Sequence, residues 1–165
     1  MGEPRQFGIA PATATGDLAA VAELFRAYAT SLDVDLAYQG FEEELRTLPG
    51  KYAPPRGALL LARSPAGAAL GCVALRPMDD PAHCEMKRLY VAPEGRGSGL
   101  GRALVDAVLA EARRMGYREM RLDSLPSMTA AIALYRTSGF EELPPYYETP
   151  VAGTVFLRRC LQREE

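Results

Sequence analysis

The residues with the clearest chemical potential lie in residues 85–102, which read E-M-K-R-L-Y-V-A-P-E-G-R-G-S-G-L-G-R. A strand-like run ends near Pro93, and an amphipathic helical pattern opens directly after three glycines: Gly97, Gly99 and Gly101. The first turn of a helix has N–H groups without internal partners, and its dipole favours negative charge. Glycines let a ligand approach the backbone, and Arg96 adds a forked cation. This stretch therefore predicts a phosphate-binding loop.

Other glycine loops fit this pattern less well. A P-loop requires a Lys-Ser/Thr pair after the glycines, and none is present here. The dinucleotide fingerprint G-x-G-x-x-G fails at Arg102, although Glu119 and Asp123 stand at about the distance of the ribose-binding acid. A structural glycine turn that only packs a helix on a strand also remains open.

The segment resembles the signature motif of the GNAT superfamily of acetyl-CoA-dependent acyltransferases. That motif has Arg or Gln, two residues, Gly, one residue, then Gly or Ala, after a strand ending in V-x-P. The matching residues are Val91, Pro93, Arg96, Gly99 and Gly101. Residues 133–140, which read A-L-Y-R-T-S-G-F, resemble a second conserved block of this family. The resemblance extends more loosely over nearly the whole chain.

Acetyl transfer to an amine requires two proton movements. An alkylamine with a pKa near 10 must lose a proton to attack, and the departing thiolate benefits from a proton donor. The resemblance places Tyr135 near the coenzyme sulfur, and its phenol carries a proton at neutral pH. The alternative is a tyrosine that simply packs against the sheet beside Ala131 and Ile132.

Glu85 is the candidate general base. It lies on the strand eleven residues before Arg96, an offset at which some GNAT enzymes carry a catalytic glutamate. The alternatives are an ion pair with Lys87 or Arg88, and a solvated strand residue. Alternation along a strand predicts one face with Glu85, Lys87, Leu89 and Val91, and the other with Met86, Arg88 and Tyr90.

The resemblance also implies where the coenzyme binds. The pantetheine arm would pair with the backbone of Leu89, Tyr90 and Val91 like an added strand. The pyrophosphate would lie on Arg96, Gly97, Ser98, Gly99, Leu100, Gly101 and Arg102. Many family members have Asn where this chain has Met128, so that contact is in question, and Ser127 is a candidate substitute.

The acceptor amine is not identified by the sequence. In this family the first helices and the last loop usually shape its pocket. The acids and tyrosines of these segments, which suit a cationic amine, are Asp33, Asp35, Tyr38, Glu42, Glu43, Glu44, Tyr146, Tyr147 and Glu148. We expect residues 42–44 to form a solvated helix face. For Asp123 and Ser124 we consider two alternatives. Both residues face the acceptor, or Asp123 pairs with a surface arginine.

Composition sets further bounds. The chain has 165 residues, 48% hydrophobic and 24% charged, with a formal charge of −2. We expect a single domain over residues 1–165, in the cytosol, without nucleic-acid or membrane partners. Three cysteines and one histidine, His83, are at no metal-ligand spacing, so we expect reduced thiols and no metal. His83 and Cys84 are neighbours on a strand and should point to opposite faces.

The periodicity predicts a mixed α/β fold in the order β-α-α-β-β-β-α-β-α-β-β. The predicted segments are strands near 6–10, 58–62, 68–76, 86–91, 118–125, 140–143 and 154–161, and helices near 18–30, 41–48, 100–115 and 127–137. By resemblance this is the GNAT fold, a mixed sheet of six to seven strands with a splayed parallel pair, flanked by about four helices.

The chain is therefore predicted to be an N-acetyltransferase that moves acetyl from acetyl-CoA directly to a primary amine on a small molecule or peptide. The alternatives are a non-catalytic acyl-CoA-binding module of the same fold and a nucleotide-binding domain. A homodimer through the C-terminal strands is compatible with the resemblance.

Overall fold

The computed structural model describes residues 6–32 and 34–161. Within these ranges seven strands form one sheet in the order β1-β2-β3-β4-β5-β7-β6. The strands are β1 Gly8–Pro11, β2 Ala58–Arg63, β3 Ala69–Pro77, β4 His83–Val91, β5 Glu119–Ser124, β6 Glu141–Glu142 and β7 Val155–Cys160. The helices are α1 Thr15–Ser31, α2 Phe41–Arg46, α3 Leu100–Arg114 and α4 Thr129–Thr137, with 3₁₀ turns η1 Leu36–Gln39, η2 Gly50–Tyr52 and η3 Pro93–Gly95. The predicted order of elements is confirmed.

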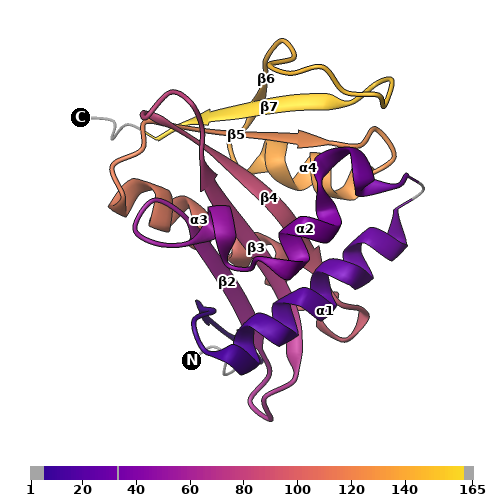
Figure 1. The fold of residues 1–165 in the computed structure, drawn as a ribbon, viewed down its shortest axis with the longest axis vertical. Coiled ribbons are helices and arrows are strands. Elements are labelled where there is room, and N and C mark those ends of the chain that lie inside the picture. Colours follow the sequence, from indigo (N-terminus) through magenta and orange to yellow (C-terminus); the bar gives the residue numbers. More distant parts are fainter. Residues whose placement is uncertain (1–5, 33, 162–165) are drawn as a thin grey trace.

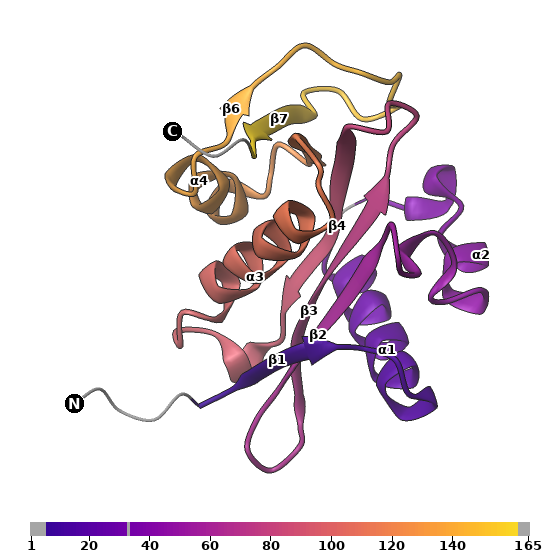
Figure 2. The same ribbon diagram turned by 90° about the vertical axis from the view of Figure 1, so that its left-hand side faces the viewer.

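Helices cover both faces of the sheet. Figure 2 shows α3 and α4 on one side of β2, β3 and β4, and α1 and α2 on the other. The packing of β2 on both of its faces explains why its sequence is an unbroken apolar run. Leu60 and Ala62 pack in the core under α3, and Leu59 and Leu61 pack in the core under α1. A strand buried on both faces has no polar side to alternate with.

The parallel pair β4–β5 opens part-way along its length. Only three residues of β4 pair with β5, His83, Cys84 and Glu85, opposite Glu119, Met120 and Arg121. Beyond Glu85 the strands diverge, and β5 continues its pairing with β7 instead. The divergence is visible in Figure 1, where β4 runs diagonally away from β5. The predicted splayed pair is therefore confirmed, and it creates a gap lined by both strand ends.

A bulge interrupts β4 beside this gap. Strand β3 pairs Cys72 with Tyr90 and Ala74 with Lys87, so two residues of β4 stand opposite one residue of β3. One of these two, Arg88, has a φ of 60°. Such an insertion leaves a residue outside the regular ladder and bends the strand.

The bulge reverses which residues share a face. Met86, Leu89 and Val91 all pack against the core under α3, whereas Tyr90 packs against the core under α1. The strict alternation predicted from the sequence, which grouped Leu89 and Val91 with Glu85, is therefore wrong beyond Lys87. The physical reason is the extra residue, because it shifts the parity of every position after it.

Candidate active site

The glycine loop joins η3 to α3 and has the geometry of an anion cradle. Gly97 and Gly99 have φ values of 81° and 80°, and a Cβ built at either would meet nothing within 4 Å. Gly99 is the N-cap of α3 and supplies no side-chain cap. The first-turn N–H groups of α3 therefore have no intrahelical partner.

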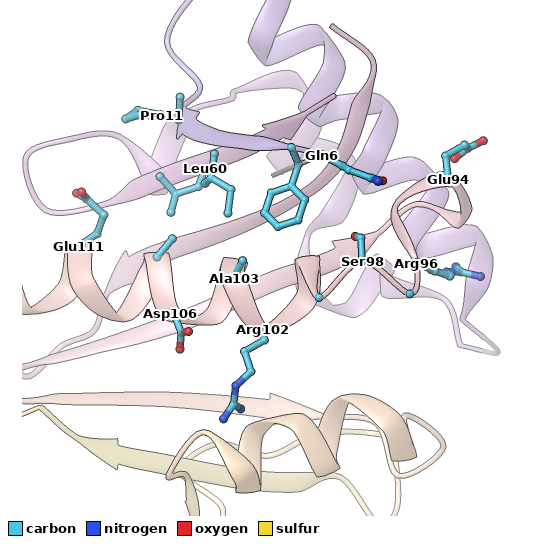
Figure 3. A pocket seen from close by; sticks show the side chains of 16 residues that line it. Gln6, Pro11, Leu60, Glu94, Arg96, Ser98, Arg102, Ala103, Asp106 and Glu111 are labelled. Carbon is cyan, nitrogen blue, oxygen red and sulfur yellow. The ribbon is translucent and has the colours of Figure 1, made fainter. Parts of the chain in front are cut away.

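A groove of about 1020 Å³ borders this loop. Figure 3 shows it between the edge of the sheet at Pro11 and Leu60 and the side of α3 that carries Ala103 and Asp106. Arg96 and Ser98 line its loop end. Arg102 points from α3 toward α4, where it donates hydrogen bonds to Thr137 and to the Oγ of Ser138, the latter at 3.2 Å.

Tyr135 lies in a separate cavity inside the splayed gap. This cavity is about 30 Å³, on the scale of one or two water molecules. It is lined by β4 at Lys87 and Leu89, by the end of β5 at Asp123 and Ser124, and by Tyr135 from α4. Met128 also lines it, whereas Ser127 is exposed. Met128 is the N-cap of α4, and no side chain caps the helix.

Burial sets the protonation state of Tyr135. The side chain is buried and its ring packs edge-on against Phe140, with centroids 5.9 Å apart. Burial raises the pKa of Tyr135, and the charge of Asp123 adds to the effect. The phenol therefore keeps its proton at neutral and mildly basic pH, as a proton donor must.

Glu85 is fully buried and fixed by hydrogen bonds at both oxygens. Its Oε1 accepts a hydrogen bond from Nε of Arg76 at 2.8 Å and lies 2.8 Å from Nη2 of the same guanidinium. Its Oε2 accepts a hydrogen bond from the hydroxyl of Tyr146 at 2.6 Å. The Nζ of Lys87 lies 4.0 Å from the same Oε1. The predicted partner Arg88 is elsewhere, and Arg76 takes its place.

Arg76 could have been found from the sequence only through the strand register. It stands directly opposite Glu85 in the β3–β4 ladder. Opposite charges at facing positions are a common stabilising pair between antiparallel strands. Both charged residues are visible in the sequence on either side of the connection at 78–82. Pairing them requires knowing the register that this connection sets between β3 and β4.

Asp123 lies at the end of β5 and faces into the gap. Its Oδ1 is 3.8 Å from Nζ of Lys87, and its Oδ2 accepts a hydrogen bond from the hydroxyl of Tyr147. The suggested pairing of Asp123 with a surface arginine is therefore wrong. Burial lowers the pKa of Lys87, while the carboxylates of Asp123 and Glu85 oppose that effect.

Glu44 is not part of a solvated helix face. It is buried with Phe41 and Leu45 on the inner side of α2, whereas Glu42 and Glu43 are exposed. Its Oε2 accepts from Nε of Arg88 at 2.9 Å, and its Oε1 accepts from the hydroxyl of Tyr52 at 2.8 Å.

The charge of Arg88 decides the ionisation of Glu44. Burial alone would raise the pKa of Glu44, but the hydrogen bonds and positive charge of Arg88 hold it below its ordinary value of 4.5. The prediction for residue 44 failed because a six-residue helix offers too few turns for its buried side to be read from periodicity.

A third cavity, of about 380 Å³, opens next to Glu85. Four of the residues predicted to shape the acceptor pocket line it: Tyr38, Tyr146, Tyr147 and Glu148. Asp35 and the three glutamates of α2 do not, and Asp33 lies outside the described residues. Lys87 lines both this cavity and the one that holds Tyr135. We call the 380 Å³ space the acceptor cavity and the smaller one the thioester cavity.

The thiols and the histidine stand apart from these cavities. Cys72 and Cys84 are buried, and burial raises the pKa of both thiols. His83 Nε2 lies 3.6 Å from Glu119 and 3.7 Å from Asp80. Among the described residues, no three His, Cys, Asp or Glu side chains are grouped to hold a metal ion. None of the described helices is long and apolar enough to cross a membrane.

Comparison with known proteins agrees with this arrangement. Residues 18–140 match the model of the Acetyltransferase (GNAT) family. The chain belongs to the GNAT acetyltransferase family. An uncharacterized N-acetyltransferase of Schizosaccharomyces pombe is 39% identical over 158 residues, which cover 96% of this chain and 97% of the relative.

Solved structures show the same GNAT fold. An acetyltransferase of the GNAT family from Staphylococcus aureus superposes with a TM-score of 0.78 at 18% identity, covering 94% of this chain and 99% of that one. A Salmonella typhimurium protein, solved with its cofactor acetyl-CoA, has a TM-score of 0.67 at 23% identity and covers 96% of both chains.

This GNAT protein is an N-acetyltransferase that uses acetyl-CoA, and its acceptor is unknown. The match to the GNAT family favours acetyl-CoA over NAD or ATP as the ligand.

Proposed function

We propose that this chain is a single-domain cytosolic enzyme that transfers acetyl from acetyl-CoA directly to a primary amine, without a metal. The observation that carries the proposal is the meeting of two cavities at Lys87. One contains the protonated phenol of Tyr135, and the other contains the fixed carboxylate of Glu85. A donor for the leaving thiolate and an acceptor for the amine proton therefore lie on the two sides of one gap.

The coenzyme would enter along the open side of β4. Its pyrophosphate would take the free N–H groups of residues 97–102 and the charge of Arg96. Its pantetheine arm would lie beside the backbone of Leu89, Tyr90 and Val91, where β5 has diverged and β4 is paired with β3 alone. The bulge at Arg88 and Leu89 then offers backbone groups outside the regular ladder to the thioester carbonyl.

These groups and solvent account for every bond and proton in the reaction. The amine nitrogen attacks the thioester carbon, and the C–N bond forms as the carbonyl oxygen takes up negative charge. Glu85 receives a proton from the nitrogen, directly or through water. Collapse of the intermediate breaks the C–S bond, and Tyr135 gives its proton to the departing sulfur. Glu85 then releases its proton to solvent, and the phenolate regains a proton from solvent.

The acceptor-side cations favour a reactive amine. The Nζ of Lys87 and the guanidinium of Arg76 both lie within 4.0 Å of Glu85. Their positive charge opposes a second ammonium ion beside Glu85 and so favours the neutral form of the acceptor amine. The hydroxyl of Tyr146 donates a hydrogen bond to the second oxygen of Glu85 and holds the carboxylate in place.

Two substitutions test the assignments. Tyr135→Phe should lower kcat by about 10- to 1,000-fold and change the Kd of CoA only a few-fold, because it removes a proton and leaves the packing intact. Glu85→Gln should lower kcat on a similar scale, with the loss greatest at the acidic end of pH 6–9, where the amine is most protonated. Thiol release from acetyl-CoA with an amine panel measures both.

The matched controls are Tyr117→Phe and Glu119→Gln. Tyr117 donates to the carbonyl of Arg56, and Glu119 accepts from Arg121, both outside the two cavities. These variants should keep wild-type turnover. Full activity of Tyr135→Phe or Glu85→Gln would remove that residue from the mechanism. Binding of acetyl-CoA without turnover on any amine would favour a non-catalytic acyl-CoA-binding module.

A further inference from the structure

Lys87 lies where the thioester cavity and the acceptor cavity meet, and it lines both of them. Its Nζ is 3.8 Å from Oδ1 of Asp123, which lines the thioester cavity. The same Nζ is 4.0 Å from Oε1 of Glu85, which lines the acceptor cavity. It also donates a hydrogen bond of 3.4 Å to Oε1 of Gln39, a residue that lines both cavities. These contacts place the amine of Lys87 itself, and not only its aliphatic stem, at the junction.

The thioester cavity brings Lys87 close to the candidate proton donor. The volume of this cavity is about 30 Å³, and Tyr135 lines it together with Lys87. Leu89, one of the backbone positions proposed to hold the pantetheine arm, lines it as well. An acetyl thioester delivered to this cavity would therefore arrive beside a primary amine that belongs to the protein itself.

The surroundings of Lys87 also supply what an attacking amine needs. An ammonium ion must lose a proton before it can attack, and the candidate general base, Glu85, lies within 4.0 Å of Nζ. The side chain of Lys87 is only 10% exposed, and burial lowers its pKa although the carboxylates of Asp123 and Glu85 oppose the effect. Lys87 is therefore neutral more often than a lysine in open solvent.

We propose that Lys87 is a site of self-acetylation, modified by the enzyme's own transfer reaction when no acceptor amine occupies the acceptor cavity. The proposal rests on the acetyltransferase function argued above, and it gives the acetyl group a second destination. The acyl donor is the same acetyl-CoA, and the catalytic groups are the same Tyr135 and Glu85.

The self-acetylation step balances in bonds and protons. The ammonium of Lys87 gives a proton to Glu85, and the neutral nitrogen then attacks the thioester carbon. The C–N bond forms, the C–S bond breaks, and Tyr135 gives its proton to the departing sulfur. The nitrogen loses its second proton to solvent, Glu85 releases its proton to solvent, and Tyr135 regains one. The products are an amide on Lys87 and free CoA.

Acetylation would remove the features that Lys87 gives to the site. The amide has no positive charge, so the ion pairs of Lys87 with Asp123 and Glu85 would be lost. The acetyl group would also occupy the junction through which an acceptor nitrogen must reach the thioester. We therefore expect a modified molecule to be inactive, and turnover to fall in step with the modified fraction.

The chain contains an internal control for this reaction, because its only lysines are Lys51 and Lys87. The side chain of Lys51 is 41% exposed, and Lys51 is not among the described residues that line the thioester cavity. Uncatalysed acetylation by acetyl-CoA would follow exposure and modify Lys51 first. Catalysed acetylation would modify Lys87 first, against the order of exposure.

The first experiment incubates protein whose lysines are unmodified with acetyl-CoA and no added amine, and it follows both lysines by peptide mass spectrometry. We expect an acetyl group on Lys87, gained at least about tenfold faster than on Lys51, because only Lys87 is held beside the thioester. CoA in place of acetyl-CoA is the control and should leave both lysines unmodified. An unmodified Lys87, or modification of Lys51 at an equal or higher rate, would overturn the proposal.

The second experiment asks whether the modification uses the catalytic groups. Tyr135→Phe and Glu85→Gln should each slow acetylation of Lys87 by about 10- to 1,000-fold, the range expected for turnover on added amines. The controls Tyr117→Phe and Glu119→Gln, outside the two cavities, should modify Lys87 at the wild-type rate. Thermal melts check that all four variants retain the fold. Unchanged acetylation in both catalytic variants would mean that these groups take no part, and the proposal would fail.

The third experiment links the modification to activity. After incubation with acetyl-CoA alone, the wild-type protein should lose thiol release with the best amine of the panel in proportion to the acetylated fraction of Lys87. Lys87→Arg keeps a cation at this position but offers no amine to acetylate, so it should keep its own initial rate after the same treatment. An equal loss of rate in Lys87→Arg would overturn the link between modification and inactivation.

Self-acetylation and the transfer function fail in different ways. Thiol release with panel amines from protein whose Lys87 stays unmodified would overturn self-acetylation and leave the transfer function intact. Tight binding of acetyl-CoA with neither thiol release nor acetylation of Lys87 would overturn both.

Discussion

Replacing Gly99 with alanine separates the cost of backbone strain from the loss of a phosphate site. Gly99 has a φ of 80°, and a Cβ there would meet no protein atom within 4 Å. Alanine in this left-handed conformation costs about 1–2 kcal/mol. For a chain of this size that lowers Tm by roughly 2–8 °C. The Cβ would also occupy the space through which a phosphate approaches the first turn of α3.

The same chain offers a matched control. Gly116, just after the end of α3, has a φ of 89° and equally open surroundings. Gly116→Ala should therefore lose a similar amount of Tm, but it lies at the opposite end of the helix from the loop. In Gly99→Ala, losing one charge-assisted hydrogen bond of about 1.5–3 kcal/mol should raise the Kd of CoA by roughly 10- to 160-fold.

Calorimetric titration with CoA measures the difference, and thermal melts without ligand measure the shared strain. Gly97→Ala, with a φ of 81°, should behave like Gly99→Ala. The reasoning would be refuted if Gly99→Ala bound CoA as tightly as wild type while losing the same Tm. It would also be refuted if Gly116→Ala weakened binding as much, because the effect would then come from general destabilisation.

Two further substitutions test the surroundings of the site. Glu44→Gln should destabilise the fold by on the order of 3 kcal/mol at pH 7, because Arg88 is left without its partner. The folded-state pKa of Glu44 is lowered, so this contribution is full above about pH 4.5 and the gap to wild type should shrink as pH falls below it. Urea unfolding across pH measures this, and exposed Glu43→Gln should stay within about 0.5 kcal/mol of wild type throughout. Gly71→Ala would bring a Cβ within 2.7 Å of the Tyr90 carbonyl and should cost about 1–3 kcal/mol in urea unfolding, whereas Gly8→Ala meets nothing within 4 Å and should cost far less.

The parts of the site that were predictable are those whose geometry is local in sequence. The glycine loop needs only a strand, a few glycines and a helix start, all within residues 91–101. Tyr135 was assigned through a contiguous motif on α4. The strands predicted near 58–62 and 68–76 are joined by a short connection, and they pair in antiparallel fashion as β2 and β3.

The acceptor side depended on contacts between distant segments. Glu44 and Arg88 are separated by 44 positions and meet only because α2 packs against β4. Tyr146 reaches Glu85 across 61 positions from the loop before β7. Helix and strand propensities depend on nearby residues and cannot predict these distant partners. The charged residues were therefore visible in the sequence, but the pairs that they form were not.

The bulge on β4 shows the same division within one strand. Residues 86–91 were recognisable as a strand from their composition, since β-branched, aromatic and apolar residues favour extended backbone. The face that each side chain occupies depends on the register with β3, where Arg88 and Leu89 stand opposite a single residue. Local sequence therefore determined that a strand leads into a glycine loop and a helix. Packing between strands decided which side of the sheet each side chain of that strand occupies.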